Sequence, residues 1–320
     1  MNSNTIYTKI SSFRSIQITS FYLCKNIYMQ LLDGKSCAAE IRSELREIVR
    51  LRKLENKKVP HLTAIIVGQN GGSISYVNAK VAACEEIGFE STLISFDELI
   101  SEGDLLKKIL ELNSNIDIDG FIVQLPLPSH INELKITQAI DPNKDVDGFH
   151  PQNLGNMMLN IPSFLPATPA GIIELISRNN IQTEGKNCVV IGRSNIVGMP
   201  LSIMLARNSN PGNCTVTLAH SKTKNLTEIC QNADILIAAI GKPEFITKEM
   251  VKEGAVVIDV GTTRIEDASR ERGWRLCGDV KFDEVAEKCS FITPVPGGIG
   301  PMTIASLMMN TLKALELQGK

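Results

Sequence analysis

A short apolar segment that runs into a glycine-bounded loop and then into an apolar helix constrains the fold more than any other feature. Residues 188–191 (CVVI) form a buried-looking strand, residues 192–198 (GRSNIVG) form the loop, and the helix begins near Pro200. This order of strand, loop and helix is typical of sites that bind a dinucleotide pyrophosphate at a helix N-terminus. Because Ser194 replaces the second glycine of the usual G-x-G-x-x-G pattern, a plain strand-to-helix connection remains the alternative.

The next expected strand indicates which dinucleotide would bind. Residues 215–219 (TVTLA) are followed by HSKTK at 220–224. NAD-binding domains usually carry an Asp or Glu there, which holds the ribose 2′-hydroxyl. Here hydroxyl and ammonium groups replace the acid and, with Arg193, suit a 2′-phosphate, so NADP is expected.

Hydrophobic patterning predicts alternating strands and helices in two units. The first is expected to hold helices over 33–54, 75–87 and 105–112 and strands over 62–67, 92–94 and 120–124, with a glycine-rich turn at Gly71 and Gly72. Long loops follow over 125–169, and the second unit holds a helix from about Gly171, strands over 188–191, 215–219, 234–239, 255–259 and 291–293, and a last helix over 303–317. The fold class is therefore α/β, with a cleft between two domains and a Rossmann-type second domain.

Composition argues against several classes of protein. The chain of 320 residues has a formal net charge of −2, so neither nucleic acid nor a membrane surface is expected as a partner. The eight cysteines form no C-x-x-C pair and no cluster with histidine, so we expect reduced thiols of a cytoplasmic protein and no metal site. No segment approaches the roughly 20 apolar residues of a membrane span.

Residues 1–28 differ from the rest of the chain. They contain three basic residues, no acidic residue and many Ser and Thr. A transit peptide has this composition, which would place the protein in the mitochondrial matrix. A single arginine, and a domain-like start immediately after Met29, favour a disordered extension or an over-long start instead.

Tyr76 and Lys80 are candidates for acid/base chemistry. They are four residues apart on an expected helix, so both side chains project from one face. A phenol and an amine placed in this way can share a proton or position a substrate group. The alternative is a tyrosine packed on the core beside a solvated lysine.

Polar residues at expected strand ends and in loops supply further candidates. Gln124 ends an apolar strand, where open α/β sheets place ligand contacts. The loop DVDGFH at 145–150 holds two carboxylates, and Asp147 could face a guanidine-like edge of a heterocycle. A solvated turn or a metal site are the alternatives, the latter weak because no second cluster of oxygen ligands is apparent.

The segment PVPGGIGP at 294–301 combines stiffness with close backbone approach. Its prolines restrict the chain, and its glycines allow backbone to lie against a flat ligand. A structural turn is the alternative.

Together these strings resemble the bifunctional methylenetetrahydrofolate dehydrogenase/methenyltetrahydrofolate cyclohydrolase (FolD-type) family. The matching strings are YVNAK at 76–80, VQLPLP at 123–128, KDVDG at 144–148, GRSNIVG at 192–198, DVGT at 259–262, GDV at 278–280 and TPVPGGIGPMT at 293–303. The resemblance covers about residues 29–317 in one unbroken order.

The resemblance implies NADP-dependent oxidation of 5,10-methylenetetrahydrofolate and hydrolysis of the methenyl product to 10-formyltetrahydrofolate. It also implies a homodimer, a folate substrate in the interdomain cleft, and a role in one-carbon metabolism. The folate-binding catalytic domain would comprise residues 29–150 and 303–320, and the NADP-binding domain residues 151–302.

Site residues are carried over by the same resemblance. Lys80 would be the catalytic lysine, Tyr76 its partner, Gln124 the residue that tunes it, and Asp147 the pterin ligand. Cofactor contacts would fall on Gly192, Arg193, Ser194, Ser221 and Thr262, with Arg193 and Ser221 nearest the 2′-phosphate. Further substrate contacts would fall on Pro296, Gly297 and Gly298.

Two positions depart from the family pattern. Ala167 replaces a cysteine that many relatives carry, which excludes a thiol role there, and Thr262 replaces the usual isoleucine. A short-chain-type dehydrogenase also uses a Tyr-x-x-x-Lys pair, but its nucleotide loop comes first, whereas Tyr76 here precedes Gly192. A dehydrogenase without cyclohydrolase activity and a non-catalytic NADP- or folate-binding protein remain alternatives.

Overall fold

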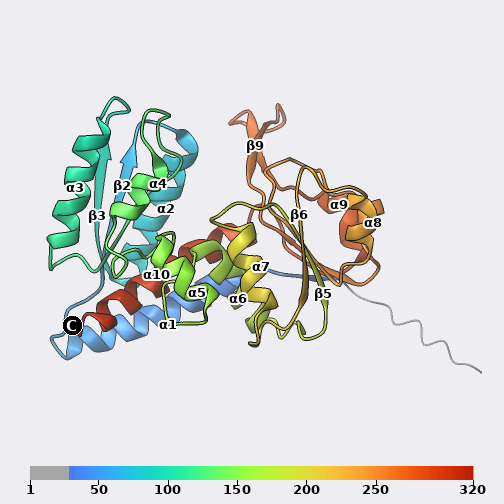
Figure 1. Cartoon of the computed structure of the whole chain (residues 1–320), viewed down its shortest axis with the longest axis horizontal. Coiled ribbons are helices and arrows are strands. Elements are labelled where there is room, and N and C mark those ends of the chain that lie inside the picture. The colour runs from blue at the N-terminus through green and yellow to red at the C-terminus, as the bar shows by residue number, and fades with distance from the viewer. Residues whose placement is uncertain (1–28, 320) are drawn as a thin grey trace, which may run out of the picture.

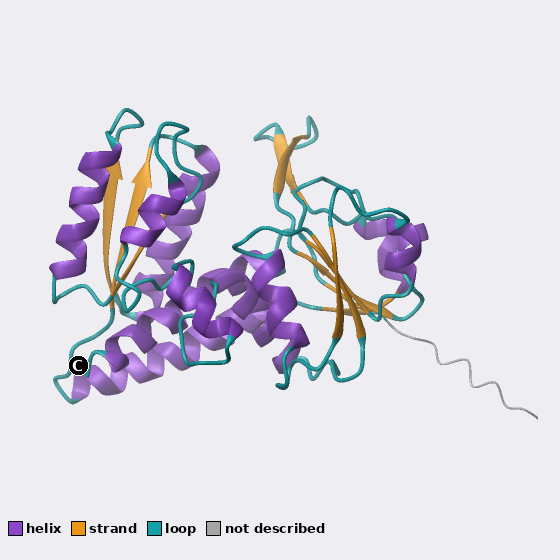
Figure 2. Ribbon diagram, in the orientation of Figure 1, coloured by secondary structure: helices purple, strands orange, loops and turns teal. Residues whose placement is uncertain are grey.

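The computed structural model describes residues 29–319, so the proposed extension over 1–28 lies outside the described residues. The described chain forms two parallel sheets, each covered by helices on both faces, joined by a layer of long helices (Figures 1 and 2). This confirms the expected α/β class. Among residues 29–319, no helix has the length and apolar character needed to span a bilayer.

The smaller sheet has the parallel strand order β3–β2–β4. Alternate side chains of its central strand enter two different cores, Leu62 and Ile66 on one face and Ile65 and Val67 on the other, as the two-residue period of a strand requires. Helices α3 and α4 cover the second face and α2 the first. The bounds are β2 (His61–Val67), β3 (Glu90–Phe96), β4 (Gly120–Val123), α2 (Gly71–Ile87), α3 (Glu102–Ser114) and α4 (Glu133–Ala139).

The larger sheet has the parallel strand order β1–β11–β8–β7–β5–β6. Since β5 has β6 on one side and β7 on the other, the chain reverses its direction of winding at β5, which is where such sheets bind ligands. Its strands are β1 (Gln30–Leu31), β5 (Asn187–Ile191), β6 (Thr215–Ala219), β7 (Ile235–Ala238), β8 (Ala255–Asp259) and β11 (Cys289–Ile292). Its helices are α7 (Gly198–Ala206), α8 (Leu226–Gln231), α9 (Phe282–Val285) and the 3₁₀ turns η1 (Lys248–Met250) and η2 (Ala286–Lys288).

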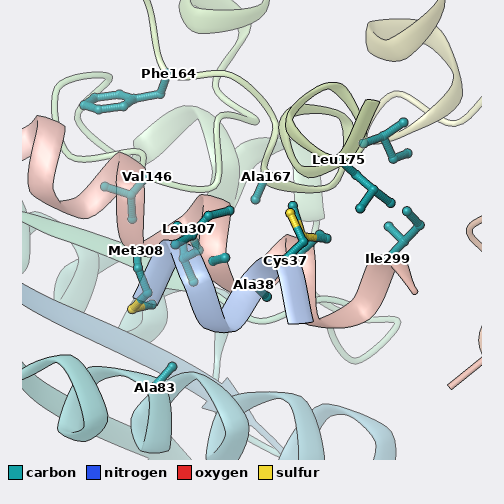
Figure 3. Close-up of a cluster of buried hydrophobic side chains, with 14 of the residues drawn as sticks. Cys37, Ala38, Ala83, Val146, Phe164, Ala167, Leu175, Ile299, Leu307 and Met308 are labelled. Atoms are coloured by element: carbon teal, nitrogen blue, oxygen red, sulfur yellow. The ribbon is translucent and has the colours of Figure 1, made fainter. Parts of the chain in front are cut away.

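Four further helices connect the two sheets, namely α1 (Gly34–Leu54), α5 (Pro151–Met158), α6 (Ala167–Arg178) and α10 (Ile299–Leu317). Side chains of α1, α6 and α10 interdigitate, for example Ala38, Leu175 and Leu307 (Figure 3). The same core includes Leu62 of the smaller sheet and Val190 of the larger one. Because one continuous core joins both sheets, the cleft between them has a well-defined geometry.

Strand β1 departs from the sequence-based division, which assigns residue 29 onward to the first domain. Leu31 pairs with Ile292 of β11, and the Leu32 amide donates to the Ile292 carbonyl at 2.8 Å. This two-residue strand therefore lies on the larger sheet, and α1 then leads the chain to the smaller one. The other predicted domain boundaries remain a proposal.

Other differences from the sequence expectation have local causes. Gly71 and Gly72 form the first turn of α2 rather than a preceding turn, because the Asn70 Oδ1 accepts the amides of Gly72 at 3.0 Å and Ser73 at 3.1 Å. The segment expected as loops over 125–169 contains α4 and α5. A projecting antiparallel hairpin of β9 (Thr263–Glu266) and β10 (Trp274–Cys277) was not anticipated (Figure 1).

Candidate active site

A cavity of about 820 Å³ lies between the two units. Helices α1 and α2 form one wall, and the loop after β8, the β9–β10 hairpin and the segment before α10 form the other. Five residues singled out from the sequence line this cavity together: Tyr76, Thr262, Pro296, Gly297 and Gly298. Its size is that of a small-molecule site.

Tyr76 lies where the cavity meets the segment 294–301. A Cβ on Gly300 would lie 3.7 Å from the Tyr76 hydroxyl, so the backbone there approaches the phenol closely. Gly298 packs against the start of α1, and a Cβ on Gly34 would come within 1.9 Å of the Gly298 carbonyl oxygen. The segment is thus packed between α1 and α2 and forms a well-packed wall of the cavity.

Lys80, one turn further along α2, is directed toward the carboxyl end of β4. Its Nζ donates to the Gln124 Oε1 at 3.0 Å, and the Gln124 amide nitrogen donates to the Leu125 carbonyl at 2.8 Å. The second bond orients the amide so that its oxygen faces the lysine. Lys80 is only 6% exposed, so few water molecules compete with Gln124 for its side-chain nitrogen.

The two carboxylates of the 145–150 loop have different surroundings. Asp145 accepts the His150 amide at 2.7 Å and the Asn153 side-chain nitrogen at 2.9 Å, so it fixes the loop. Burial raises the pKa of Asp147, and the charge of Lys80 partly offsets that rise. Lys80 thus has a direct hydrogen bond to Gln124 and an electrostatic interaction with Asp147, and we call these three residues the polar group.

The nucleotide-loop candidates lie at the carboxyl ends of β5 and β6. Ile191 pairs with Ala219, so Arg193 and Ser221 follow neighbouring strand ends. Both side chains and that of Ser194 are exposed. Ser194 Oγ accepts the amides of Val197 at 3.2 Å and Gly198 at 3.4 Å, which shapes the turn into α7.

The geometry of this loop fits a bound dinucleotide. Gly192 has φ +120°, and a Cβ there would lie 2.1 Å from the Ala239 carbonyl oxygen, so only glycine suits the position. Ser194 has no positive φ, which is why a glycine is not needed there. An exposed guanidinium and hydroxyls beside a helix N-terminus are donors that a phosphorylated ribose requires.

Sequence reasoning gave no role to several residues that shape the site. Arg264 and Trp274 line the cavity, and the Arg264 guanidinium donates to the Gly71 carbonyl at 3.0 Å and lies 4.3 Å from the Trp274 ring centre. Asp259 and Asp279 were noted only within matching strings. The position of each aspartate at or near a strand end, close to a glycine, could have indicated a role in the site.

Comparison with known proteins gives one consistent family. The model of the tetrahydrofolate dehydrogenase/cyclohydrolase catalytic domain matches residues 32–147, and that of the NAD(P)-binding domain matches residues 166–319. The chain is 62% identical to the bifunctional protein FolD of Cytophaga hutchinsonii, over 91% of this chain and 100% of the relative. It is 58% identical to that of Flavobacterium johnsoniae, over 91% and 98%.

Solved structures agree with this comparison. The bifunctional FolD methylenetetrahydrofolate dehydrogenase/cyclohydrolase of Campylobacter jejuni superposes with a TM-score of 0.85 at 44% identity, covering 91% of this chain and 100% of that one. The Trypanosoma brucei enzyme, solved with NADP cofactor and inhibitor, gives a TM-score of 0.86 at 35% identity, covering 91% and 99%.

Proposed function

Because this chain belongs to the tetrahydrofolate dehydrogenase/cyclohydrolase family, we propose that its interdomain cavity and the adjoining polar group carry out both reactions of the family. The enzyme oxidises 5,10-methylenetetrahydrofolate to the 5,10-methenyl form and hydrolyses that product to 10-formyltetrahydrofolate. The chemistry that bound NADP would supply is that of a hydride acceptor for the methylene carbon.

The hydrogen bond between Lys80 and Gln124 is the observation that carries the hydrolytic half of this proposal. Hydrolysis of the methenyl cation requires water to add and protons to move between water and the folate nitrogens. Lys80 is the amine that moves those protons, and Gln124 holds its Nζ at a fixed position at the end of β4.

The pterin and the rest of the folate are held by different groups. Asp147 would accept hydrogen bonds from the guanidine-like edge of the pterin, and its electrostatic interaction with Lys80 supports a substrate position that both residues share. Tyr76 and the wall formed by Pro296, Gly297 and Gly298 confine the remainder of the folate in the cavity. This arrangement supplies the juxtaposition on which both steps depend.

On the nucleotide side, Gly192 and Ser194 would hold the pyrophosphate, and Arg193 and Ser221 would bind the 2′-phosphate. Thr262, which lines the cavity, would supply a further contact to the nucleotide. The absence of an acid after β6 supports NADP over NAD.

Replacement of Arg193 by alanine tests the nucleotide preference. Loss of a charge-assisted hydrogen bond is expected to lower kcat/KM for NADP by about 10- to 100-fold. Activity with NAD, which lacks the 2′-phosphate, serves as the internal control and should change little. An equal loss with both nucleotides would contradict the assignment of Arg193.

The proposal extends to assembly and compartment. A homodimer joined through the NADP-binding domains follows from the family resemblance, and light scattering of the purified protein tests it. We place the enzyme in the cytoplasm, where 10-formyltetrahydrofolate would supply purine synthesis and related one-carbon reactions, including those of methionine and histidine synthesis.

The simplest test of the proposed function separates its two halves. Purified enzyme is given 5,10-methenyltetrahydrofolate without nucleotide, and loss of the methenyl absorbance is followed. Hydrolysis above the spontaneous rate supports the cyclohydrolase. A rate equal to the spontaneous one would leave a dehydrogenase alone.

A further inference from the structure

Two buried aspartates meet between the nucleotide loop and the folate wall. Asp259 ends β8 and Asp279 follows β10, and the two residues are 3% and 0% exposed. The Asp279 amide donates to the Asp259 Oδ1 at 2.9 Å, so the pair is directly linked.

Asp279 holds the loop that follows β7. Its carboxylate accepts three consecutive backbone amides, from Ile240 at 2.7 Å, Gly241 at 3.0 Å and Lys242 at 2.7 Å. The residue just before them is Ala239, whose carbonyl oxygen lies close against Gly192. Asp279 therefore fixes the segment against which the nucleotide loop packs.

Asp259 extends the same network to the other side of the cleft. Its carboxylate accepts the amides of Gly261 and Val280, each at 2.9 Å, in addition to that of Asp279. Its own amide donates to the Thr293 Oγ1 at 2.7 Å, one residue before the folate wall begins. The network thus reaches Thr262 through Gly261, and Pro294 through Thr293.

Close packing shows that the carboxylates are built into the fold. A Cβ on Gly278 would lie 1.9 Å from the Asp259 Oδ2, and a Cβ on Gly261 would lie 2.4 Å from the Asp279 Oδ1. Burial raises the pKa of Asp259 to about 6, which its backbone donors partly counteract. Buried carboxylates are costly unless fully hydrogen-bonded, and six backbone amides meet that need here.

We propose that Asp259 and Asp279 are positioning residues for hydride transfer, because together they set the distance between the nucleotide loop and the folate wall. The inference rests on the proposed function, since it assigns these two surfaces to NADP and folate. Hydrolysis of the methenyl form needs only Lys80, Gln124 and the folate site, so it depends less on this distance. Because Asp279 holds the nucleotide side of this network, disturbing Asp279 should lower hydride transfer much more than hydrolysis.

The test uses Asp279→Asn in the full-length enzyme. The amide retains one acceptor oxygen but turns an N–H₂ group toward backbone donors, so the loop over 239–242 must shift. We expect the Kd for NADP, measured by calorimetry, to rise by about 10-fold and dehydrogenase kcat to fall by at least as much. Hydrolysis of methenyltetrahydrofolate without nucleotide should stay within about two-fold of the wild-type rate, on the same reasoning.

Asp119→Asn is the matched control. Asp119 is also fully buried and accepts the His61 amide at 2.9 Å, but it lies at the opposite end of the smaller sheet from Gln124. This variant should lower thermal stability and leave the Kd for NADP and the ratio of the two activities unchanged. A parallel fall of both activities in Asp279→Asn, or an unchanged Kd for NADP, would overturn the proposal.

If Asp279→Asn does not fold, hydrogen exchange of the wild-type enzyme tests whether Asp279 holds the loop after β7. Without ligands, the amides of Ile240, Gly241 and Lys242 should exchange as slowly as those of β7, because Asp279 holds them before the nucleotide arrives. Rapid exchange would overturn the proposal. Failure of the proposed function would give a different result from failure of this inference. In that case the wild-type enzyme would lack turnover while these amides remained protected from exchange.

Discussion

Replacing Lys80 by methionine is expected to lower cyclohydrolase turnover by about 10²–10⁴-fold, the usual contribution of a positioned acid/base group. Methionine keeps much of the length and apolar contact of the lysine stem, but it cannot move a proton or donate to Gln124. NADP binding and the thermal unfolding temperature should change little, since the nucleotide loop lies on the other sheet. The measurement is the hydrolysis rate of methenyltetrahydrofolate without nucleotide.

Lys107→Met is the matched control for this variant. Lys107 is exposed on α3, which covers the far face of the smaller sheet, so the same substitution there should leave both activities unchanged. If Lys80→Met hydrolyses the methenyl form at the wild-type rate, the amine has no part in the reaction. Loss of folding in Lys80→Met alone would be visible in its thermal transition.

Replacing Asp147 by alanine is expected to weaken folate binding in both reactions. Because the variant loses hydrogen bonds to a charged carboxylate, kcat/KM should fall by about 10- to 100-fold for each substrate. The effect should be shared, because the pterin occupies one position during both steps. Binding of NADP alone should be unaffected.

Asp145→Asn separates a pterin contact from a loop defect. Asp145 fixes the same loop through His150 and Asn153, so its substitution disturbs the loop without removing the Asp147 carboxylate. We expect a smaller loss of folate affinity than for Asp147→Ala. Equal losses in the two variants, or an unchanged affinity in Asp147→Ala, would contradict a direct pterin contact.

Periodicity and strand-end chemistry predicted much of the fold. Apolar runs located β2, β5 and β8 within a residue or two, because strands buried on both faces are nearly continuous in sequence. Short polar elements such as α4, α5 and the β9–β10 hairpin were missed, since their stability comes from packing rather than from a local pattern. The pairing of β1 with β11 joins residues far apart in the chain and has no local signal.

The candidate site was predicted unevenly for a similar reason. Tyr76 and Lys80 share a helix, so their proximity follows from spacing alone. The contact between Lys80 and Gln124 depends on how α2 packs against the smaller sheet, and the family resemblance rather than spacing indicated it. The pairing of Asp259 with Asp279 depends on two strand ends and two glycines, which only the folded chain brings together.

The most direct test of the account follows the wild-type enzyme with 5,10-methylenetetrahydrofolate and NADP. NADPH formation and methenyl absorbance are recorded in the same reaction. A coupled enzyme should form NADPH with little accumulation of the methenyl form, and should do so faster with NADP than with NAD. Stoichiometric accumulation of the methenyl form, or no reduction of NADP, would contradict the assignment of both reactions to this chain.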